Sequence, residues 1–485
     1  MTAFSVALRT ARPRVFAGTG LALALGLVLA GCQSSSPYEP PRFPFAPGYK
    51  AGHKSAARDV PVLLANSAWW ERLDDPVLNR LVDHALLGSP SITAAQARIA
   101  QARAAFAATS RAAGLSSAAG LSLDGTDSTD AVAGGTLDLG FTWLLDPYGA
   151  RRAERQAAGG RVTVAEAETD AARLALIRAM ATAYVDLRLG QRRLVLYEQE
   201  LHNRRQTLAM TRVLFDAEAT TRLEITRSEA RLAEIEAERP LRRATITARQ
   251  NEIAVLAGLA PGELGRRGVN LDLQTGQPRP ALSPEVGIPA DLLRNRPDIR
   301  IAERRYYIAL AELGQAEAAL YPRLSLIGTL SGMALQGGRS GAEYSFGPAL
   351  QLPILPGTAA RATVEGGRAR VAEAHAIWKS TVLGAILEVE NALIDYQSTS
   401  AAAQASDKVV RLYAEALDLT RQVFAQGGAT LGDLIDAEQA LATAEQARAE
   451  RRARRAQSFV DLNTRLGAGS TGAPGEIPVA VAQQP

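Results

Sequence analysis

The sequence contains a single cysteine, four histidines and few aromatic residues, which make up 5% of its 485 positions. One cysteine has no intramolecular disulfide partner. The histidines are scattered and lack the spacing of metal ligands. They are His53, His84, His202 and His375. Glycine-rich phosphate loops and P-loops are also missing, so we expect no enzymatic activity, no metal and no cofactor. The formal net charge of +4 is near balance and gives no indication of a nucleic-acid partner.

Long apolar runs are also scarce. After residue 31 no run reaches about 18 apolar residues, so we expect no transmembrane helix there, and this part could cross a membrane only as a closed β-barrel. The one long apolar run, from about Val15 to Ala30, follows the basic residues Arg9, Arg12 and Arg14. This run is too short and too rich in glycine and alanine to be a good spanning helix. Residues 1–31 are therefore predicted to be a secretory signal peptide.

The apolar run ends in Leu29-Ala30-Gly31-Cys32, which resembles the lipobox of bacterial lipoproteins. In this interpretation Cys32 receives an S-diacylglycerol and an N-acyl chain, and several chains together anchor a protein stably. An ordinary signal peptide with a chance cysteine is the alternative. Because residue 33 is Gln rather than Asp, the inner-membrane retention signal of lipoproteins is missing, which implies the outer membrane. The proline-rich residues 32–64 are predicted to be an extended tether, and residues 468–485 a disordered tail.

Residues that favour helices are abundant. Alanine and arginine dominate the sequence, and Ala, Arg, Glu and Leu are strong helix formers. No proline occurs from Ala150 to Phe215 or from Ala360 to Phe424, and a helix over the first stretch would be roughly 95 Å long. Each stretch is followed by a turn and a return helix, which predicts long helical hairpins over about 150–257 and 360–466. Pro240 is expected to kink the first return helix.

Four segments amid the helical sequence alternate between apolar and polar residues with a period of two. They form two predicted hairpins, at about residues 115–146 and 323–355. Each strand has roughly 10 residues, the length of a tilted membrane strand. A small soluble sheet is the alternative. Pro348 and Pro353 weaken the last strand, because proline cannot donate to a strand ladder.

The two halves of the chain repeat each other. Similar residues recur at an offset of 209 positions, as in Phe215 and Phe424, Thr221 and Thr430, Glu229 and Glu438, and Leu232 and Leu441. The chain is therefore an internal tandem repeat. The first repeat spans residues 65–260 and the second 289–467, with a linker at 261–288. Each repeat reads helix, β-hairpin, long helix, turn, long helix.

The strands and the long helices together constrain the assembly. Four strands cannot close a barrel, which needs about eight or more, and unpaired strand edges are untenable in lipid. Sharing one barrel between copies removes the problem, and three copies would supply twelve strands and twelve long helical segments. Strand number alone would also permit two or four copies. The predicted fold class is mainly α with a small β part.

Four motifs follow one another along the chain. They are Trp69-Trp70-Glu71-Arg72-Leu73-Asp74-Asp75-Pro76, Trp143-Leu144-Leu145-Asp146-Pro147-Tyr148-Gly149, Ile288-Pro289-Ala290-Asp291-Leu292-Leu293-Arg294-Asn295-Arg296-Pro297-Asp298-Ile299 and Glu388-Val389-Glu390-Asn391-Ala392-Leu393. In these motifs the sequence resembles the outer-membrane factors of efflux systems, the TolC/OprM family, and especially its NodT-like lipoprotein branch.

The resemblance implies a homotrimer with a transmembrane β-barrel of twelve strands in the outer membrane and an α-helical barrel in the periplasm. The inter-repeat linker would belong to an equatorial belt around the tube. The resemblance also implies a passive exit duct of a tripartite efflux system. Its partners would be a periplasmic adaptor, of the membrane fusion protein class, and an inner-membrane pump of the RND type.

In this family the tips of the helical hairpins face the adaptor. The residues that match these tips are Glu218, Thr220 and Thr221 in the first turn, and Gly427, Gly428, Thr430 and Leu431 in the second. Glu218 stands where the family prefers Gly, which makes the geometry of the first turn uncertain. Asp433 and Asp436 match positions that point into the closed periplasmic entrance of the family and would form a carboxylate gate. Ordinary solvated acids of a first helical turn are the alternative.

Two other functions are consistent with the sequence. The first is the exit channel of a type I protein-secretion system, which shares the fold. The second is a structural periplasmic lipoprotein that uses its hairpins as a scaffold and does not conduct. The amphipathic hairpins argue against the scaffold, and the lipobox and NodT-like motifs favour efflux.

Overall fold

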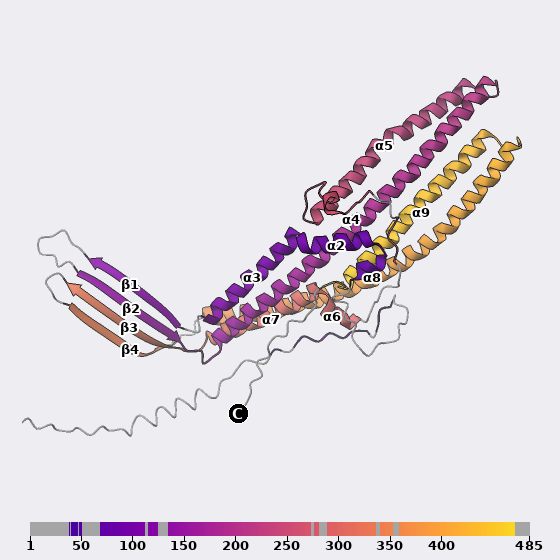
Figure 1. The fold of residues 1–485 in the computed structure, drawn as a ribbon. Helices are drawn as coiled ribbons and strands as arrows, with labels where there is room; N and C mark the ends of the chain where they lie inside the picture. Colours follow the sequence, from indigo (N-terminus) through magenta and orange to yellow (C-terminus); the bar gives the residue numbers. More distant parts are fainter. Residues whose placement is uncertain are drawn as a thin grey trace, which may run out of the picture. The chain divides into compact units, whose positions relative to one another are not determined.

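The computed structural model describes residues 38, 40–46, 48–50, 68–111, 115–124, 134–272, 276–280, 289–335, 340–352 and 358–470. The predicted signal peptide, Cys32 and most of the predicted tail lie outside these residues. The described chain is mainly helical, with one four-stranded sheet (Figure 1). This arrangement confirms the predicted fold class. The described residues form two compact units, one that includes those of Arg103–Arg161 and Arg305–His375, and another that includes those of Arg42–Ala102, Val162–Arg304 and 376–470.

The order of the elements shows the internal repeat. The first repeat contains η1 (Trp69–Leu73), α2 (Pro76–Gly88), α3 (Pro90–Arg111), β1 (Leu115–Asp124), β2 (Gly134–Leu144), α4 (Ala150–Asp216) and α5 (Arg222–Leu256). The second contains η3 (Pro289–Asp291), α6 (Leu292–Asn295), α7 (Pro297–Ala318), β3 (Arg323–Leu335), β4 (Ser340–Gln351), α8 (Thr358–Ala425) and α9 (Leu431–Arg465). Between the repeats lies η2 (Gly265–Arg267). Helix α5 runs on through Pro240.

The sheet has the antiparallel order β1-β2-β3-β4, so the two hairpins join through β2 and β3. Its register places apolar residues of neighbouring strands in the same rows, because side chains alternate between the two faces of a strand. One such row contains Phe141 and Phe346, whose rings lie 5.8 Å apart across β3. Pro348 lies in β4, an outer strand of the described sheet, which is where proline is found in sheets.

The two faces of the sheet differ in chemistry. One face carries exposed apolar side chains, namely Leu121, Leu123, Leu137, Leu139, Phe141, Trp143, Leu330, Tyr344, Phe346 and Leu350. The other face carries hydroxyl and carboxyl groups that bond to one another across the strands. The Ser331 hydroxyl donates to Asp138 at 2.6 Å, and the Thr329 and Ser345 hydroxyls lie 2.7 Å apart. The sheet is therefore amphipathic, as its alternating sequence predicts.

Within the second unit, α5, the part of α4 from Val162, α9 and the part of α8 from Ala376 lie side by side in the order α5, α4, α9, α8 (Figure 1). Ion pairs mark each contact: Arg205 with Glu236 between α4 and α5 at 2.7 Å, Arg193 with Glu450 between α4 and α9 at 2.6 Å, and Arg452 with Asp407 between α9 and α8 at 2.5 Å. The central pair, α4 and α9, joins the two repeats. Among the described residues, no helix is both long enough and apolar enough to cross a membrane.

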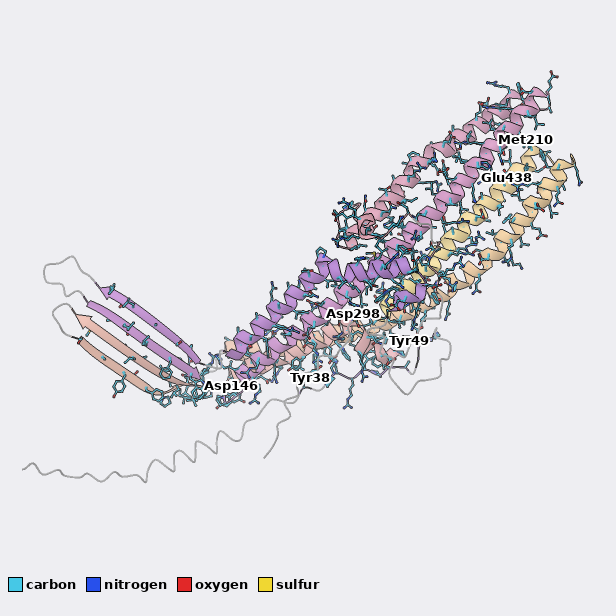
Figure 2. The ribbon with its side chains drawn as sticks, in the orientation of Figure 1. Tyr38, Tyr49, Asp146, Met210, Asp298 and Glu438 are labelled. Atoms are coloured by element: carbon cyan, nitrogen blue, oxygen red, sulfur yellow. The ribbon has the colours of Figure 1, made fainter. Side chains whose placement is uncertain are left out.

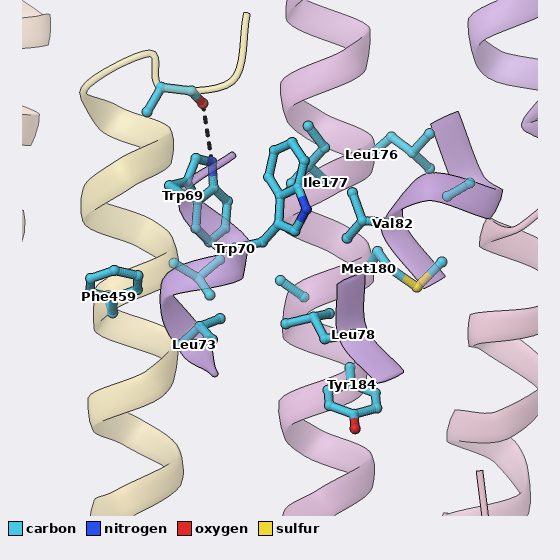
Figure 3. Packing of buried hydrophobic residues seen from close by; sticks show 14 of the residues in the cluster. Trp69, Trp70, Leu73, Leu78, Val82, Leu176, Ile177, Met180, Tyr184 and Phe459 are labelled. Carbon is cyan, nitrogen blue, oxygen red and sulfur yellow. Dashed lines mark hydrogen bonds between the residues drawn. The ribbon is translucent and has the colours of Figure 1, made fainter. Parts of the chain in front are cut away.

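The core of this unit gathers around the first tryptophan motif (Figure 3). Trp69 and Leu73 are almost fully buried, and they pack with Ile177 of α4 and Phe459 of α9. The indole N–H of Trp69 donates to the carbonyl of Ala468 at 3.1 Å. The start of the first repeat is thus tied directly to the end of the second.

This contact moves one predicted boundary. The disordered tail was predicted from residue 468, but Ala468 and Ser470 are fully buried. The Arg173 side chain donates to the Gly469 carbonyl at 2.9 Å, and the Ser470 hydroxyl lies near the Asn295 carbonyl. Composition alone missed this segment because its order comes from long-range contacts.

A pair of equivalent glycines supports the duplication. Gly258 after α5 and Gly467 after α9 both have positive φ, 76° and 78°, and they lie 209 positions apart. A Cβ on Gly258 would lie 2.2 Å from the Gly88 carbonyl oxygen, and a Cβ on Gly467 would lie 2.3 Å from that of Asn295. In both repeats the end of the long hairpin therefore packs against the backbone that ends an earlier short helix.

Candidate functional site

The predicted site residues lie on two helical turns, one between α4 and α5 and the other between α8 and α9. Both turns belong to the same compact unit and lie at the same end of it (Figure 1). The structure therefore brings both hairpin tips to one end of the helical layer.

The second tip ends α8 with a left-handed residue. Gly427 has φ 75°, and the Gly428 N–H donates to the Val423 carbonyl at 3.0 Å, the bond that closes a Schellman turn. Helix α9 then starts with a complete capping box. The Thr430 hydroxyl accepts from the Asp433 N–H at 3.1 Å, and the Asp433 carboxylate accepts from the Thr430 N–H at 2.8 Å. This tip is closed at both helix ends.

The first tip has the same turn with less support. Glu218 takes the place of Gly427 with φ 55°, and the Ala219 N–H donates to the Leu214 carbonyl at 2.8 Å. Thr221 stands at the N-cap of α5 but makes no side-chain capping bond. Its partner position, Glu224, pairs with Arg227 at 2.8 Å instead. The turn geometry that Glu218 left uncertain is thus the same as in the second tip.

Each hairpin is crossed by an ion pair at equivalent positions. Arg212 and Glu229 lie 2.9 Å apart in the first hairpin, and Arg421 and Glu438 lie 3.1 Å apart in the second. Figure 2 labels Glu438 on the second hairpin. Both members of the second pair lie 209 positions after those of the first. The arginine of each pair is more than half exposed, and pairs at the surface contribute little to stability. Their recurrence therefore points to a shared register between the two helices of each hairpin.

The two predicted gate residues differ in their surroundings. Asp433 accepts a hydrogen bond from the Thr430 hydroxyl at 2.7 Å and from the Thr430 N–H. These two bonds, the hydroxyl first, lower the pKa of Asp433. Asp436 is exposed on the next turn of α9. The capping role of Asp433 agrees with the alternative of an ordinary first-turn acid, and a gate role for both residues stays a prediction.

No sequence pattern predicts the charged cluster around Arg296, whose own side chain is buried while its acidic partners Asp298 and Glu388 are partly exposed. The Arg296 guanidinium donates to Asp298 at 2.6 Å, to Glu388 at 2.8 Å and to the Arg465 carbonyl at 3.0 Å. Glu388 also pairs with Arg465 at 2.8 Å. Burial would lower the pKa of Arg296, but the hydrogen bonds and charges of Asp298 and Glu388 raise it. This cluster joins the end of α6 and the start of α7 to α8 and to the end of α9.

The cluster brings together residues from two of the sequence motifs. Arg296 and Asp298 come from the motif that opens the second repeat, and Glu388 comes from the motif within the second long helix. The motifs mark these residues in the sequence, but only the fold shows that their side chains lie in contact. In the described part of the chain, no group of three or more His, Cys, Asp or Glu side chains could hold a metal ion.

Comparisons with known proteins agree with this architecture. The sequence model of the family described as Outer membrane efflux protein matches residues 81–259 and 288–468, one block in each repeat. The chain is 33% identical over 460 residues to Nodulation protein T of Rhizobium leguminosarum bv. trifolii, covering 91% of this chain and 96% of that protein. It is 29% identical over 472 residues to outer membrane protein OprJ of Pseudomonas aeruginosa, covering 92% and 95%.

Solved structures show the same similarity. The outer-membrane channel OprN matches with a TM-score of 0.81 and 29% identity, covering 91% of this chain and 100% of that one. The open state of the MtrE outer membrane channel of Neisseria gonorrhoeae matches with a TM-score of 0.77 and 25% identity, covering 91% and 99%. These matches confirm the family resemblance that the sequence motifs carry.

Proposed function

Because the chain belongs to the outer membrane efflux protein family, we propose that it is the exit duct of a tripartite efflux system. In this role it passively conducts substrates that an inner-membrane pump of the RND type delivers through a periplasmic adaptor. Relatives in this family include OprJ and a solvent efflux pump outer membrane protein. The energy for transport would come from the pump, and the duct would add only a path.

The amphipathic sheet carries this proposal. One face is apolar enough to meet lipid, and the other is lined with hydroxyl and carboxyl groups that suit water. In the described part of the chain, the outer edges of β1 and β4 pair with no other strand. Open edges in lipid would leave backbone groups unsatisfied. Three copies that share one closed sheet would satisfy them.

The helical layer supports the same assembly. Its outer members, α5 and α8, expose large apolar side chains. On α8 these include Leu387, Ile394, Leu412 and Leu419, at spacings of 7, 18 and 7 residues that return to one side of the helix. On α5 they include Leu223, Leu241 and Val255. We assign these two edges to contacts between neighbouring copies of the chain in a homotrimer.

Three further assignments belong to this proposal. Cys32 would carry the acyl chains that anchor the protein in the outer membrane. Both hairpin tips would contact the adaptor, through Glu218, Thr220 and Thr221 in the first and through Gly427, Gly428, Thr430 and Leu431 in the second. Asp433 and Asp436 would line the periplasmic entrance, where three copies would supply six carboxylates.

Native mass spectrometry and planar-bilayer recording of the membrane-extracted protein test the proposal. We expect a trimer, acyl mass on Cys32 and discrete ion conductance. A stable monomer without conductance would overturn the duct and favour the structural lipoprotein. A conducting trimer whose loss blocks export of a secreted protein, and leaves small-molecule efflux intact, would favour the type I secretion channel instead.

A further inference from the structure

The N-terminal segment before the first repeat is packed against the second repeat. We define the strap as residues 42–46 and 48–50, which lie in the same compact unit as the helices they touch. The sequence predicts an extended tether here, and the strap has no helix or strand. Its aromatic side chains are nevertheless set into the core.

The first anchor point of the strap is aromatic. The Phe43 ring lies edge-on to the buried Trp378 ring of α8, with centroids 6.2 Å apart and an interplanar angle of 80°. The Phe45 ring packs on Phe43 at 4.8 Å. Both phenylalanines also contact the hydrophobic core of the unit. Edge-to-face pairs of this kind are favourable beyond the apolar area they bury.

The second anchor point lies beside the charged cluster around Arg296. Tyr49, which Figure 2 labels, is buried, with 8% of its surface exposed, and it belongs to the hydrophobic core. Burial, and then the charges of Asp291 and Glu390, raise the pKa of Tyr49, so the hydroxyl stays protonated. The next residue fixes the backbone, because the Lys50 N–H donates to the Glu390 carboxylate at 2.6 Å.

The ring contact of Phe43 and the hydrogen bond of Lys50 are both made with the second repeat. Trp378 and Glu390 belong to α8, and Asp291 belongs to η3. The positions 209 earlier, Thr169 and Ala181, carry a small polar and a small apolar side chain. At these two positions the first repeat therefore lacks the aromatic ring and the carboxylate that contact the strap in the second repeat.

We propose that the strap is a clamp that fixes the lipidated N-terminus to the second repeat. The contacts of Phe43, Tyr49 and Lys50 support the clamp itself. Only its effect at the membrane rests on the acylation of Cys32 that is part of the proposed function. Ten residues lie between Cys32 and Phe43, so the two Cα atoms can be at most about 40 Å apart. With the clamp closed, the acyl chains would hold α8 at a set distance from the membrane.

Limited trypsin digestion of the full-length trimer tests the clamp. Arg42 is exposed and directly precedes Phe43. Trypsin must also bind the residue after the scissile bond, which is the packed Phe43, so cleavage after Arg42 requires the strap to leave its seat. We expect Phe43→Ala to speed this cleavage at least tenfold and to raise hydrogen exchange in α8 around Trp378. Tyr49→Phe keeps the buried ring and should leave cleavage at the wild-type rate. Ile377→Ala, an exposed neighbour of Trp378 on α8, is the matched control on the receiving helix and should also have no effect.

Equal cleavage rates in wild type and Phe43→Ala, at unchanged exchange in α8, would overturn the clamp. Comparing the masses of wild type and Cys32→Ser tests acylation separately. If the wild-type chain is not acylated but the strap still protects Arg42, the clamp is retained and only its link to the membrane is lost. If the protein does not conduct but remains protected from trypsin after Arg42, the result would contradict the duct and not the clamp.

Discussion

At the scale of single residues, the least expected feature is a glutamate in left-handed backbone conformation at the first tip. Glu218 has φ 55° at the position where the second tip has Gly427. A residue with a Cβ pays roughly 1–2 kcal/mol for this conformation. The turn forms anyway because the Ala219 N–H still donates to the Leu214 carbonyl and the two helices on either side lie in contact, as the pair of Arg212 and Glu229 shows.

Glu218→Gly should therefore stabilise the first tip. We expect about 1 kcal/mol, which corresponds to roughly fivefold slower hydrogen exchange of the amides in the turn, including that of Ala219. Gly427→Ala is the matched change in the second tip and should speed exchange there by a similar factor. Hydrogen exchange with mass spectrometry would measure both. An unchanged rate in Glu218→Gly would mean that the surrounding helices, and not this turn, limit the opening of the tip.

At the scale of elements, the two return helices begin differently. Thr430 caps α9 through its hydroxyl, whereas Thr221 makes no such bond at the start of α5. We expect Thr430→Ala to cost about 1 kcal/mol in the first turn of α9, seen as faster exchange at Asp433. Thr221→Ala should leave the first turn of α5 unchanged. If both substitutions have the same effect, the difference in capping has no energetic consequence.

The capping box also predicts a pH dependence. The Thr430 hydrogen bonds lower the pKa of Asp433 in the folded state, so its contribution is present above the unfolded value of about 3.9 and is lost as the pH falls through the lower folded value. The difference in Tm between wild type and Asp433→Asn should be constant from about pH 8 to 5 and close below about pH 3.9. A difference that grows on acidification would contradict the capping role.

Much of this element pattern could be predicted from the sequence. The period-two segments became strands β1 to β4, and the proline-free stretches became α4 and α8, because both signals are local. The docking of Phe43 and Tyr49, the burial of Ala468 and the cluster around Arg296 could not be predicted. Each depends on residues more than 90 positions apart, and no local pattern encodes such a meeting.

At the scale of the whole molecule, a single copy of the chain does not cover the exposed apolar side chains on one side of α8. Leu387 and Leu412 lie 25 residues apart, close to seven helical turns, and both are more than half exposed. Burying a leucine fully is worth about 1.5–3 kcal/mol, and in a trimer each copy would contribute one such edge.

Leu387→Glu combined with Leu412→Glu should therefore weaken the assembly. We expect a shift from trimer to monomer in mild detergent, measured by sedimentation, because two carboxylates would replace apolar contacts at every one of the three interfaces. Gln404→Glu adds a charge to an exposed position of the same helix without removing an apolar side chain, and it should leave the trimer intact. Dissociation by Gln404→Glu as well would show that added charge alone disrupts the assembly. A trimer that survives the double substitution would place the contacts between copies on the sheet edges β1 and β4, and not on the helical layer.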